Sequence, residues 1–203
     1  METTVRAAES GEVGKLGRVL GLAFADDPII GWLIPSEANR ARRAAIMFAT
    51  MARHHYLRHG GADVACDENG EIVGAALWAP PGHWDIPISE LGRMLPGLTL
   101  ALRSRLLASA RMSERMAQAH PKEPHWYLGF IGSLPEVRGR GVGHTLLAAR
   151  LTRCDELGAP TYLESSKPSN VPYYTRYAFE LTREVDVTGG GPPMWPMWRP
   201  PRD

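Results

Sequence analysis

The chain has 203 residues, with 23 Lys and Arg against 22 Asp and Glu, which gives a formal net charge of +1 at pH 7. This balance offers no electrostatic reason to expect nucleic acid or an anionic membrane surface as a partner. A chain of this length buries about 70% of its unfolded surface, so we expect residues 1–203 to form one domain without covalent staples.

Cysteine usage and apolar segments bear on the compartment. Cys66 and Cys154 are the only cysteines, and two cysteines far apart in the sequence are typical of a reducing cytosol. Residues 1–9 lack the apolar segment of a signal peptide, and apolar runs such as residues 75–80 are too short to span a bilayer. We therefore expect a cytoplasmic protein without a membrane partner.

The first sixty residues predict a short strand and two helices. The strand covers residues 3–6, and apolar side chains at spacings of three and four predict a helix over 11–25. Pro28 is expected to end that helix. A second, longer helix is expected over residues 36–59, with a serine as its N-cap and two glycines after its end.

A β-hairpin and a helical insertion come next. Asn69-Gly70 is a strong two-residue turn signal between the strand-like segments 62–66 and 71–79. Residues 83–120 then have the apolar spacing of helices, and we expect one or two helices inserted between strands. The leucines with that spacing are Leu91, Leu95, Leu98 and Leu102.

The remaining residues predict alternating strands and helices. The expected order is a strand at 125–133, a helix at 143–157, a strand at 160–164, a short helix at 170–177, and two paired strands at 179–187 and 193–199. This order predicts an α/β or α+β fold in which helices flank a mixed sheet.

The Gly- and Arg-rich turn at residues 138–143, between a strand and a helix, is the most informative segment. Glycines let the backbone approach an anion, successive backbone N–H groups form a cradle, and the helix N-terminus adds partial positive charge. Arg138 and Arg140 can add charge-assisted hydrogen bonds. The turn is therefore typical of a pyrophosphate-binding loop.

Other interpretations of this turn fit less well or remain open. A dinucleotide fingerprint requires its third glycine where His144 stands, and a Walker loop requires a Gly-Lys-Ser/Thr ending that is absent. A purely structural strand-to-helix turn with solvated arginines remains the alternative.

Two blocks resemble the GNAT superfamily of N-acyltransferases. Arg138-x-x-Gly141-x-Gly143 after a strand resembles the family's acyl-CoA loop, and residues 162–166 followed by 170–179 resemble its asparagine, helix, tyrosine and Gly-Phe block. Further segments resemble the puromycin N-acetyltransferase-like subgroup: residues 24–28, 121–126, 159–166 and 191–195. Two positions depart from the pattern, since Ala178 stands where the family usually has glycine and Lys167 where many relatives have asparagine.

The resemblance implies a mostly antiparallel mixed sheet of about seven strands, acetyl-CoA as co-substrate, and direct transfer to an amine. The residues that it implies for acetyl-CoA are Ile131, Gly132, Ser133, Arg138, Gly139, Arg140, Gly141, Val142, Gly143, His144 and Asn170. Backbone N–H groups at Gly132 or Ser133 are the expected donors to the acyl oxygen.

Two side chains are expected to move protons. By resemblance Tyr174 faces the sulfur, and a phenol of pKa about 10 can donate to a thiolate whose conjugate acid has a pKa of about 8.5. Glu164, on the strand beside acyl-CoA, is the expected base, acting through a water. The structural alternatives are an aromatic core residue and a solvated strand glutamate.

The acceptor side is less defined. Phe24, Trp32, Trp78 and Trp84 are the candidates to wall an acceptor pocket, although buried aromatics are more often core. We expect a small-molecule amine, antibiotic-like by the subgroup resemblance, to enter from the side built by residues 24–36 and 80–120. A catalytically inactive acyl-CoA-binding sensor is the alternative function, and a homodimer is one possible assembly.

Neither a metal nor a nucleophilic cysteine is expected. His55 and His59 lie four residues apart on the expected helix, but no third ligand stands at a recognisable spacing, so we interpret them as surface or interface residues. Cys154 falls on the apolar stripe of its helix and is expected in the core.

Overall fold

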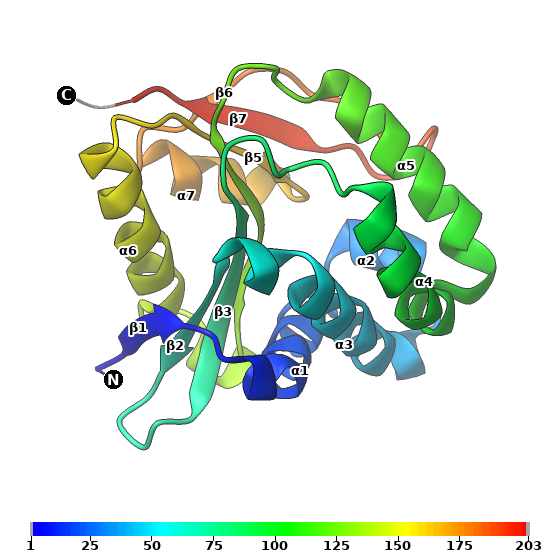
Figure 1. Cartoon of the computed structure of the whole chain (residues 1–203), viewed down its shortest axis with the longest axis horizontal. Helices are drawn as coiled ribbons and strands as arrows, with labels where there is room; N and C mark the ends of the chain where they lie inside the picture. Colours follow the sequence, from blue (N-terminus) through cyan, green and yellow to red (C-terminus); the bar gives the residue numbers. More distant parts are fainter. Residues whose placement is uncertain (1, 202–203) are drawn as a thin grey trace.

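A computed structural model describes residues 2–201. Met1 and residues 202–203 lie outside the described residues, and so do the two ends of the domain expected over 1–203 and the first residue of the segment 1–9. The described residues form a seven-stranded sheet in the order β1-β2-β3-β4-β5-β7-β6 (Figure 1). The strands are β1 Thr4–Ala7, β2 Ala62–Cys66, β3 Ile72–Ala79, β4 Trp126–Ser133, β5 Thr161–Ser165, β6 Glu180–Leu181 and β7 Trp195–Arg199. All neighbours are antiparallel except β4 and β5, which confirms the expected mixed, mostly antiparallel sheet.

Helices cover both faces of this sheet (Figure 1). On one face lie α1 Val13–Ala23, α2 Pro28–Leu33, α3 Glu37–His54, α4 Ile88–Leu102 and α5 Leu106–Ala119, and on the other α6 Val142–Glu156 and α7 Val171–Thr175. Each face has its own cluster of buried apolar side chains, with Phe48 and Leu77 in one and Leu146 and Phe179 in the other. Cys66 and Cys154 are buried free thiols.

Pro28 does not act as the expected stop signal. It occupies the first turn of α2, a helix that the sequence pattern did not indicate. Asp27 caps α2, because its side chain accepts hydrogen bonds from the backbone N–H groups of Ile29 and Ile30 at 2.9 and 3.0 Å. Proline is favourable at the first helical position because its missing N–H has no intrahelical partner there.

Two other boundaries differ from expectation. The long helix ends at His54, and a 3-10 turn, Tyr56–His59, leads to Gly60 in the left-handed conformation at φ 65°. The strand expected over 179–187 is reduced to β6, with a single further bridge between Val185 and Met194. The expected pairing of the last two strands is confirmed, because β7 pairs with β6. On its other edge β7 pairs with β5.

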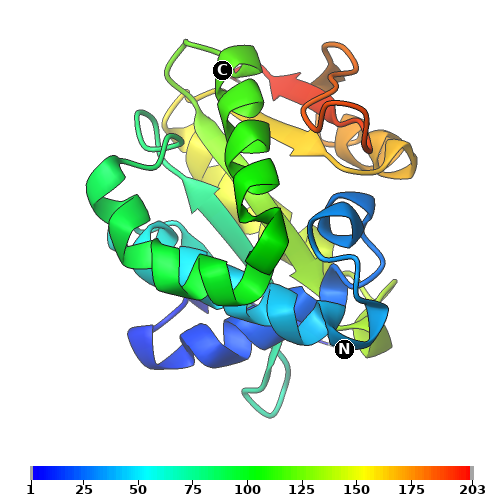
Figure 2. The same ribbon diagram turned by 90° about the vertical axis from the view of Figure 1, so that its right-hand side faces the viewer.

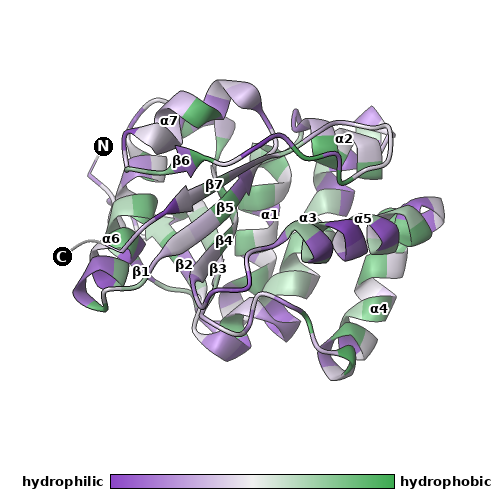
Figure 3. Cartoon of the chain, turned by 90° about the horizontal axis from the view of Figure 1, so that it is seen from above, coloured by the Kyte–Doolittle hydropathy of each residue, from purple (hydrophilic) through white to green (hydrophobic). Residues whose placement is uncertain are grey.

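The inserted helices α4 and α5 are confirmed. On the first face α4 packs on α3, and α5 runs across the front of the sheet (Figure 2). Their expected apolar spacing is only half correct. Leu102 is buried, whereas Leu91 and Leu95 are 44% and 48% exposed. The ribbons of α4 and α5 carry both hydrophobic and hydrophilic colours along their length (Figure 3). None of the helices within residues 2–201 is both long and apolar enough to cross a membrane.

The sheet opens between its two parallel strands. β4 and β5 pair only from Trp126↔Thr161 to Leu128↔Leu163, although β4 continues to Ser133. The β3–β4 pair changes register at the same level: Trp78 pairs with Leu128, and the next pair is Leu77 with Phe130. Gly129 is therefore the extra residue of a bulge in β4. Beyond it, the edge of β4 that faces β5 has no strand partner within the described residues, so its backbone polar groups are free for a ligand.

Candidate active site

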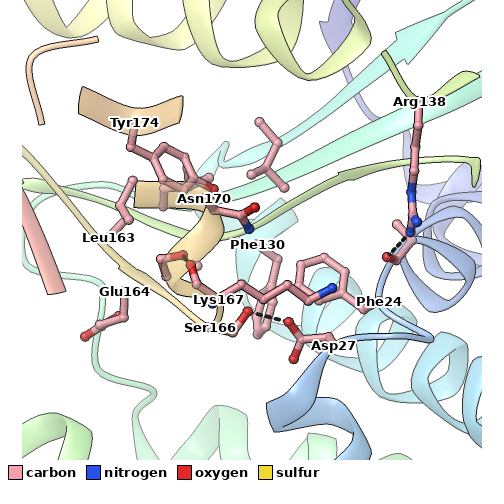
Figure 4. Close-up of a pocket in the computed structure, with 15 residues that line it drawn as sticks. Phe24, Asp27, Phe130, Arg138, Leu163, Glu164, Ser166, Lys167, Asn170 and Tyr174 are labelled. Atoms are coloured by element: carbon pink, nitrogen blue, oxygen red, sulfur yellow. Dashed lines mark hydrogen bonds between the residues drawn. The ribbon is translucent and has the colours of Figure 1, made fainter. Parts of the chain in front are cut away.

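The gap between β4 and β5 continues into a cavity of about 320 Å³ (Figure 4). Its walls come from the end of α1 and the turn that follows, from β4, and from the segment running from β5 into α7. The lining residues are Ala23, Phe24, Asp27, Leu128, Gly129, Phe130, Ile131, Arg138, Leu163, Glu164, Ser165, Ser166, Lys167, Asn170 and Tyr174. Both expected proton-transfer residues, Glu164 and Tyr174, therefore border one cavity.

Glu164 is a buried carboxylate with one unused oxygen. Its side chain is 4% exposed, and its Oε1 lies 3.5 Å from Nδ1 of His120. Its Oε2 has no hydrogen-bond partner. Such an atom is costly to bury unless a ligand or water completes it. The structural alternative of a solvated strand glutamate is wrong, because this carboxylate is shielded from solvent.

Tyrosines surround Glu164 on the same face of the sheet. Tyr127 pairs in register with Tyr162, two residues before Glu164 on β5. Burial, followed by the negative charge of Glu164, raises the pKa of both Tyr127 and Tyr162 well above its ordinary value. Both side chains therefore remain neutral phenols beside the carboxylate.

Tyr174 is held by the short helix α7. It is 8% exposed, and its ring packs edge-on against Phe179 with centroids 6.0 Å apart. Burial, with a smaller contribution from the charge of Asp27, raises the pKa of Tyr174. The neighbouring Tyr173 and Tyr177 lie toward the glycine turn instead, where Tyr177 Oη lies 2.6 Å from His144 Nδ1.

The glycine turn has the conformation expected of an anion cradle. Gly139 and Gly141 have φ angles of 77° and 88°, which glycine adopts without a Cβ penalty, and Gly141 caps α6. No described hydrogen bond occupies the backbone N–H groups of residues 141–144, the free donors at the start of α6. These glycines, with Val142 and Gly143, lie outside the cavity itself.

The two arginines of the turn differ in their surroundings. Arg138 lines the cavity and donates a hydrogen bond to the carbonyl of Ala23 at 2.8 Å, with its Nη1 3.4 Å from Asp26 Oδ2. Arg140 is exposed, and its side chain makes no described hydrogen bond or ion pair. His144 is also exposed, and its imidazole turns to Tyr177.

A pair of aspartates ties the turn after α1 to the β5–α7 segment. Asp26 Oδ1 lies 3.4 Å from Lys167 Nζ, so this carboxylate bridges Lys167 and Arg138. Asp27, besides capping α2, accepts a very short hydrogen bond from the Ser166 hydroxyl, drawn in Figure 4. Lys167, the departure from the family's asparagine, thus lines the cavity with its charge paired.

Other expected contacts with acetyl-CoA lie along β4 and at the start of α7. Ile131 and Asn170 line the cavity. Gly132 packs against the end of α1, where a Cβ would meet the Ala23 side chain at 2.6 Å, and Ser133 ends the strand. The absence of a side chain at Gly132 therefore lets the turn after α1 approach the opening.

The four aromatic candidates for the acceptor site do not gather together. Phe24 lines the cavity in a cluster with Phe48 and Phe130. Trp84 stacks on His120 with centroids 3.9 Å apart, and Trp32 lies elsewhere, under Arg105. The expectation for Trp78 was wrong: it is completely buried on the opposite face of the sheet, in the cluster packed against α6.

His55 and His59 meet a third ligand-type side chain that sequence spacing did not indicate. Glu90 of α4 accepts a hydrogen bond from His55 Nδ1 at 2.7 Å and one from His59 Nε2 at 3.2 Å. His55 is 1% exposed and packs inside the chain, so the interpretation of His55 as a surface or interface residue was wrong. The three could hold a metal ion, and as they stand each carboxylate oxygen pairs with one imidazole. The cluster joins the insertion to the end of α3.

Sequence reasoning missed His120 and His125. His120 follows α5, His125 immediately precedes β4, and both are buried beside Tyr162. The local signal was a pair of histidines five residues apart with Pro121 and Pro124 between them, which by itself indicates no function.

The sequence of this chain was compared with those of known protein families. The profile of the acetyltransferase (GNAT) family matches residues 34–179, well over half of the chain. The chain belongs to the GNAT acetyltransferase family. It is therefore an acyltransferase. Its seven-stranded sheet, which opens between β4 and β5, has the fold of that family.

Several relatives agree with this assignment. An uncharacterized N-acetyltransferase of Schizosaccharomyces pombe is 26% identical over 194 residues, covering 90% of this chain and 76% of that protein. A crystal structure from Corynebacterium glutamicum, described as histone acetyltransferase HPA2 and related acetyltransferase, is 30% identical with a TM-score of 0.78 and covers 100% of this chain and 98% of its own. The Drosophila melanogaster polyamine N-acetyltransferase shares the fold at 18% identity and a TM-score of 0.60, covering 98% and 100%.

Proposed function

We propose that residues 1–203 form a single acetyl-CoA-dependent N-acetyltransferase domain, which transfers the acetyl group directly from the thioester to the amine of a small molecule. The observation that carries this proposal is the buried, unpartnered Oε2 of Glu164 at a cavity that Tyr174 also borders. One side chain is suited to accept a proton and the other to donate one, and an acyl transfer from sulfur to nitrogen needs both.

The free backbone donors support acetyl-CoA as the co-substrate. The glycine turn and the first turn of α6 offer unpaired N–H groups to a pyrophosphate, and Arg140 adds an uncommitted charge beside them. The open edge of β4, from Gly129 to Ser133, offers backbone groups to the amide-containing arm. Asn170, which lines the cavity, would contact the same arm in place of the usual asparagine at Lys167.

The transfer needs two proton movements. The acceptor ammonium loses a proton to Glu164 through a water, and its nitrogen forms a bond to the acetyl carbon as the carbon–sulfur bond breaks. Backbone N–H groups at Gly132 or Ser133 would stabilise the oxyanion. Tyr174 would protonate the leaving thiolate, because burial keeps the proton on its phenol until the sulfur anion forms in the same dry cavity.

The acceptor is an ammonium attached to an apolar or aromatic body. A buried carboxylate at the cavity favours a cation, while Phe24 and Phe130 supply an apolar wall. The resemblance to puromycin-type enzymes supports an antibiotic-like amine, and the polyamine and arylalkylamine acetyltransferases among the structural neighbours are named for cationic acceptors. Residues 24–36 and 80–120 would form its entrance.

Thiol release from acetyl-CoA, measured with a panel of aryl, alkyl and aminonucleoside amines, tests this function. We expect turnover with at least one class of primary amine and a loss of about a hundredfold or more in Glu164→Gln. Acetyl-CoA binding without release in any arm would favour the acyl-CoA sensor. Release that is equal in wild type and Glu164→Gln would contradict the role of the carboxylate.

A further inference from the structure

A chain of three buried side chains leads away from the cavity into the protein. Glu164 Oε1 lies 3.5 Å from His120 Nδ1, His120 Nε2 lies 3.0 Å from His125 Nε2, and His125 Nδ1 lies 2.6 Å from the carbonyl oxygen of Glu123. The chain joins the end of the helical insertion to β5, and it includes Glu164, a residue that lines the cavity and whose Oε2 has no described hydrogen-bond partner.

The far end of this chain determines where its protons lie. A carbonyl oxygen only accepts, so His125 Nδ1 must carry a hydrogen. Burial is the main cause of a lowered pKa at His125, which keeps that ring neutral and leaves its Nε2 as an acceptor. His120 must then donate from Nε2. The remaining nitrogen of His120, Nδ1, is the one ring position in the chain free to gain or lose a proton, and it faces Glu164.

We infer that His120 is a positioning residue that shares one proton with Glu164 during the transfer, an inference that rests on the proposed function. The proton that leaves the acceptor ammonium bonds to Glu164. Rotation of the carboxyl group presents the new O–H to His120 Nδ1, which takes the proton and leaves Glu164 ionised beside an imidazolium. The pair is neutral overall with the proton on either side chain, and with the proton on His120 the Glu164 carboxylate is ionised again beside a cationic partner.

The groups that face His120 favour a charge on this ring alone. Trp84, from the segment after β3, stacks on the imidazole with an interplanar angle of 21°, a contact suited to a cationic ring, and Lys122 lies 5.5 Å from the Trp84 ring. Tyr127 of β4 and Tyr162 of β5 pack edge-on against His120 as neutral phenols. His125 completes the set and stays neutral. Glu164 is thus the only anion against the ring among the described contacts.

Histidine ¹⁵N NMR of the full-length protein tests the proton assignment without any turnover. We expect His120 to be the Nε2–H tautomer at high pH and to gain its proton at Nδ1 as the pH falls, with its titration moved to lower pH in Glu164→Gln, while His125 stays the Nδ1–H tautomer throughout. His120 found as the Nδ1–H tautomer, or a titration unaffected by Glu164→Gln, would overturn the inference whether or not an acceptor is known.

The kinetic arm uses His120→Gln, with His54→Gln on α3 as a matched control. We expect kcat to fall about tenfold, the acidic limb of its pH profile to move to lower pH, and the KM for acetyl-CoA to stay unchanged, with the control equal to wild type. A wild-type pH profile in folded His120→Gln overturns the inference. A wild type that binds acetyl-CoA but transfers to no amine contradicts the proposed function and leaves the NMR result to decide on the shared proton.

Discussion

Lys167 Nζ lies 3.4 Å from Asp26 Oδ1, so a cation at the cavity is already paired before any ligand enters. The same carboxylate lies 3.4 Å from Arg138. Burial acts to raise the pKa of Asp26, but the Lys167 and Arg138 charges outweigh it and hold that pKa below its usual value. Asp26 is therefore ionised at neutral pH, and it competes with any anionic ligand for both cations.

Asp26→Asn is expected to tighten the binding of CoA by about threefold to tenfold at low ionic strength, because it frees two partly exposed cations while keeping the side-chain shape. A fluorescence titration at two salt concentrations measures this, and the gain should shrink in high salt. Glu156→Gln, at the far end of α6, changes the net charge equally and should leave the affinity unchanged. Weaker binding in Asp26→Asn would mean that Asp26 organises the site instead.

Arg140→Ala is expected to weaken CoA binding by about 1.5–3 kcal/mol, the value of a charge-assisted hydrogen bond. Arg140 is the arginine of the glycine turn without a described partner, so its loss leaves no other contact broken. Calorimetric titration of CoA measures the change, with Arg153→Ala near the end of α6 as a control of equal charge. Equal affinities of wild type and Arg140→Ala would remove Arg140 from the phosphate site.

Ala178→Gly is expected to raise the free energy of unfolding by about 1 kcal/mol, because Ala178 has a left-handed φ of 63° that costs an L-residue about 1–2 kcal/mol. The melting temperature should rise by about 2–4 °C. Ala148→Gly, inside α6, should instead destabilise by about 1 kcal/mol. A lower melting temperature in Ala178→Gly would show that its methyl group contributes more by packing than its backbone costs.

The same position illustrates how far the sequence could predict this protein. Ala178 was recognised as a departure from a glycine, and its backbone conformation explains why glycine is usual there. The β2–β3 hairpin was correct because Asn69-Gly70 is a local signal, and local signals need no tertiary context. The seven-stranded sheet required the family resemblance, since strand order depends on contacts far apart in the chain.

The site was predictable only where one segment carries it. Glu164 and Tyr174 lie in one block of sequence and do border one cavity. The His120–His125 chain and the pairing of Glu90 with His55 join segments up to 44 residues apart, as in His120 to Glu164, and no periodicity reports such contacts. Trp78 misled because a strand tryptophan can point to either face, and its face depends on the register with β4.

Glu90→Gln is expected to make stability less dependent on pH in acid. Burial acts to raise the pKa of Glu90, but hydrogen bonds from His55 and His59 outweigh it and hold the pKa below the ordinary 4.5. A carboxyl group whose pKa is lower when folded stabilises the protein above its unfolded pKa, and this stabilisation is lost as the pH falls through the folded value. Wild type should therefore lose unfolding free energy more steeply than Glu90→Gln below pH 4.5.

Urea unfolding from pH 7 to pH 3 measures this difference, and Glu114→Gln on the exposed side of α5 is the control. At pH 7 the Glu90 variant should be less stable by about 1.5–3 kcal/mol, because a buried charge-assisted hydrogen-bond acceptor is lost. Parallel pH dependences in wild type and Glu90→Gln would show that the cluster does not couple the insertion to α3 in the folded protein.

Tyr174→Phe is expected to lower kcat by about a hundredfold or more while the KM for acetyl-CoA stays nearly constant. Phenylalanine keeps the ring and its edge-on contact with Phe179, so packing and stability should barely change. What it loses is the proton that burial holds on the phenol until the thiolate departs. Tyr173→Phe is the matched control, because that neighbour lies toward the glycine turn and does not line the cavity. Steady-state assays of all three proteins with one active amine, beside a CoA titration, measure the effect. A fall of less than threefold in Tyr174→Phe, or an equal fall in Tyr173→Phe, would mean that the thiolate leaves unprotonated or takes its proton from water.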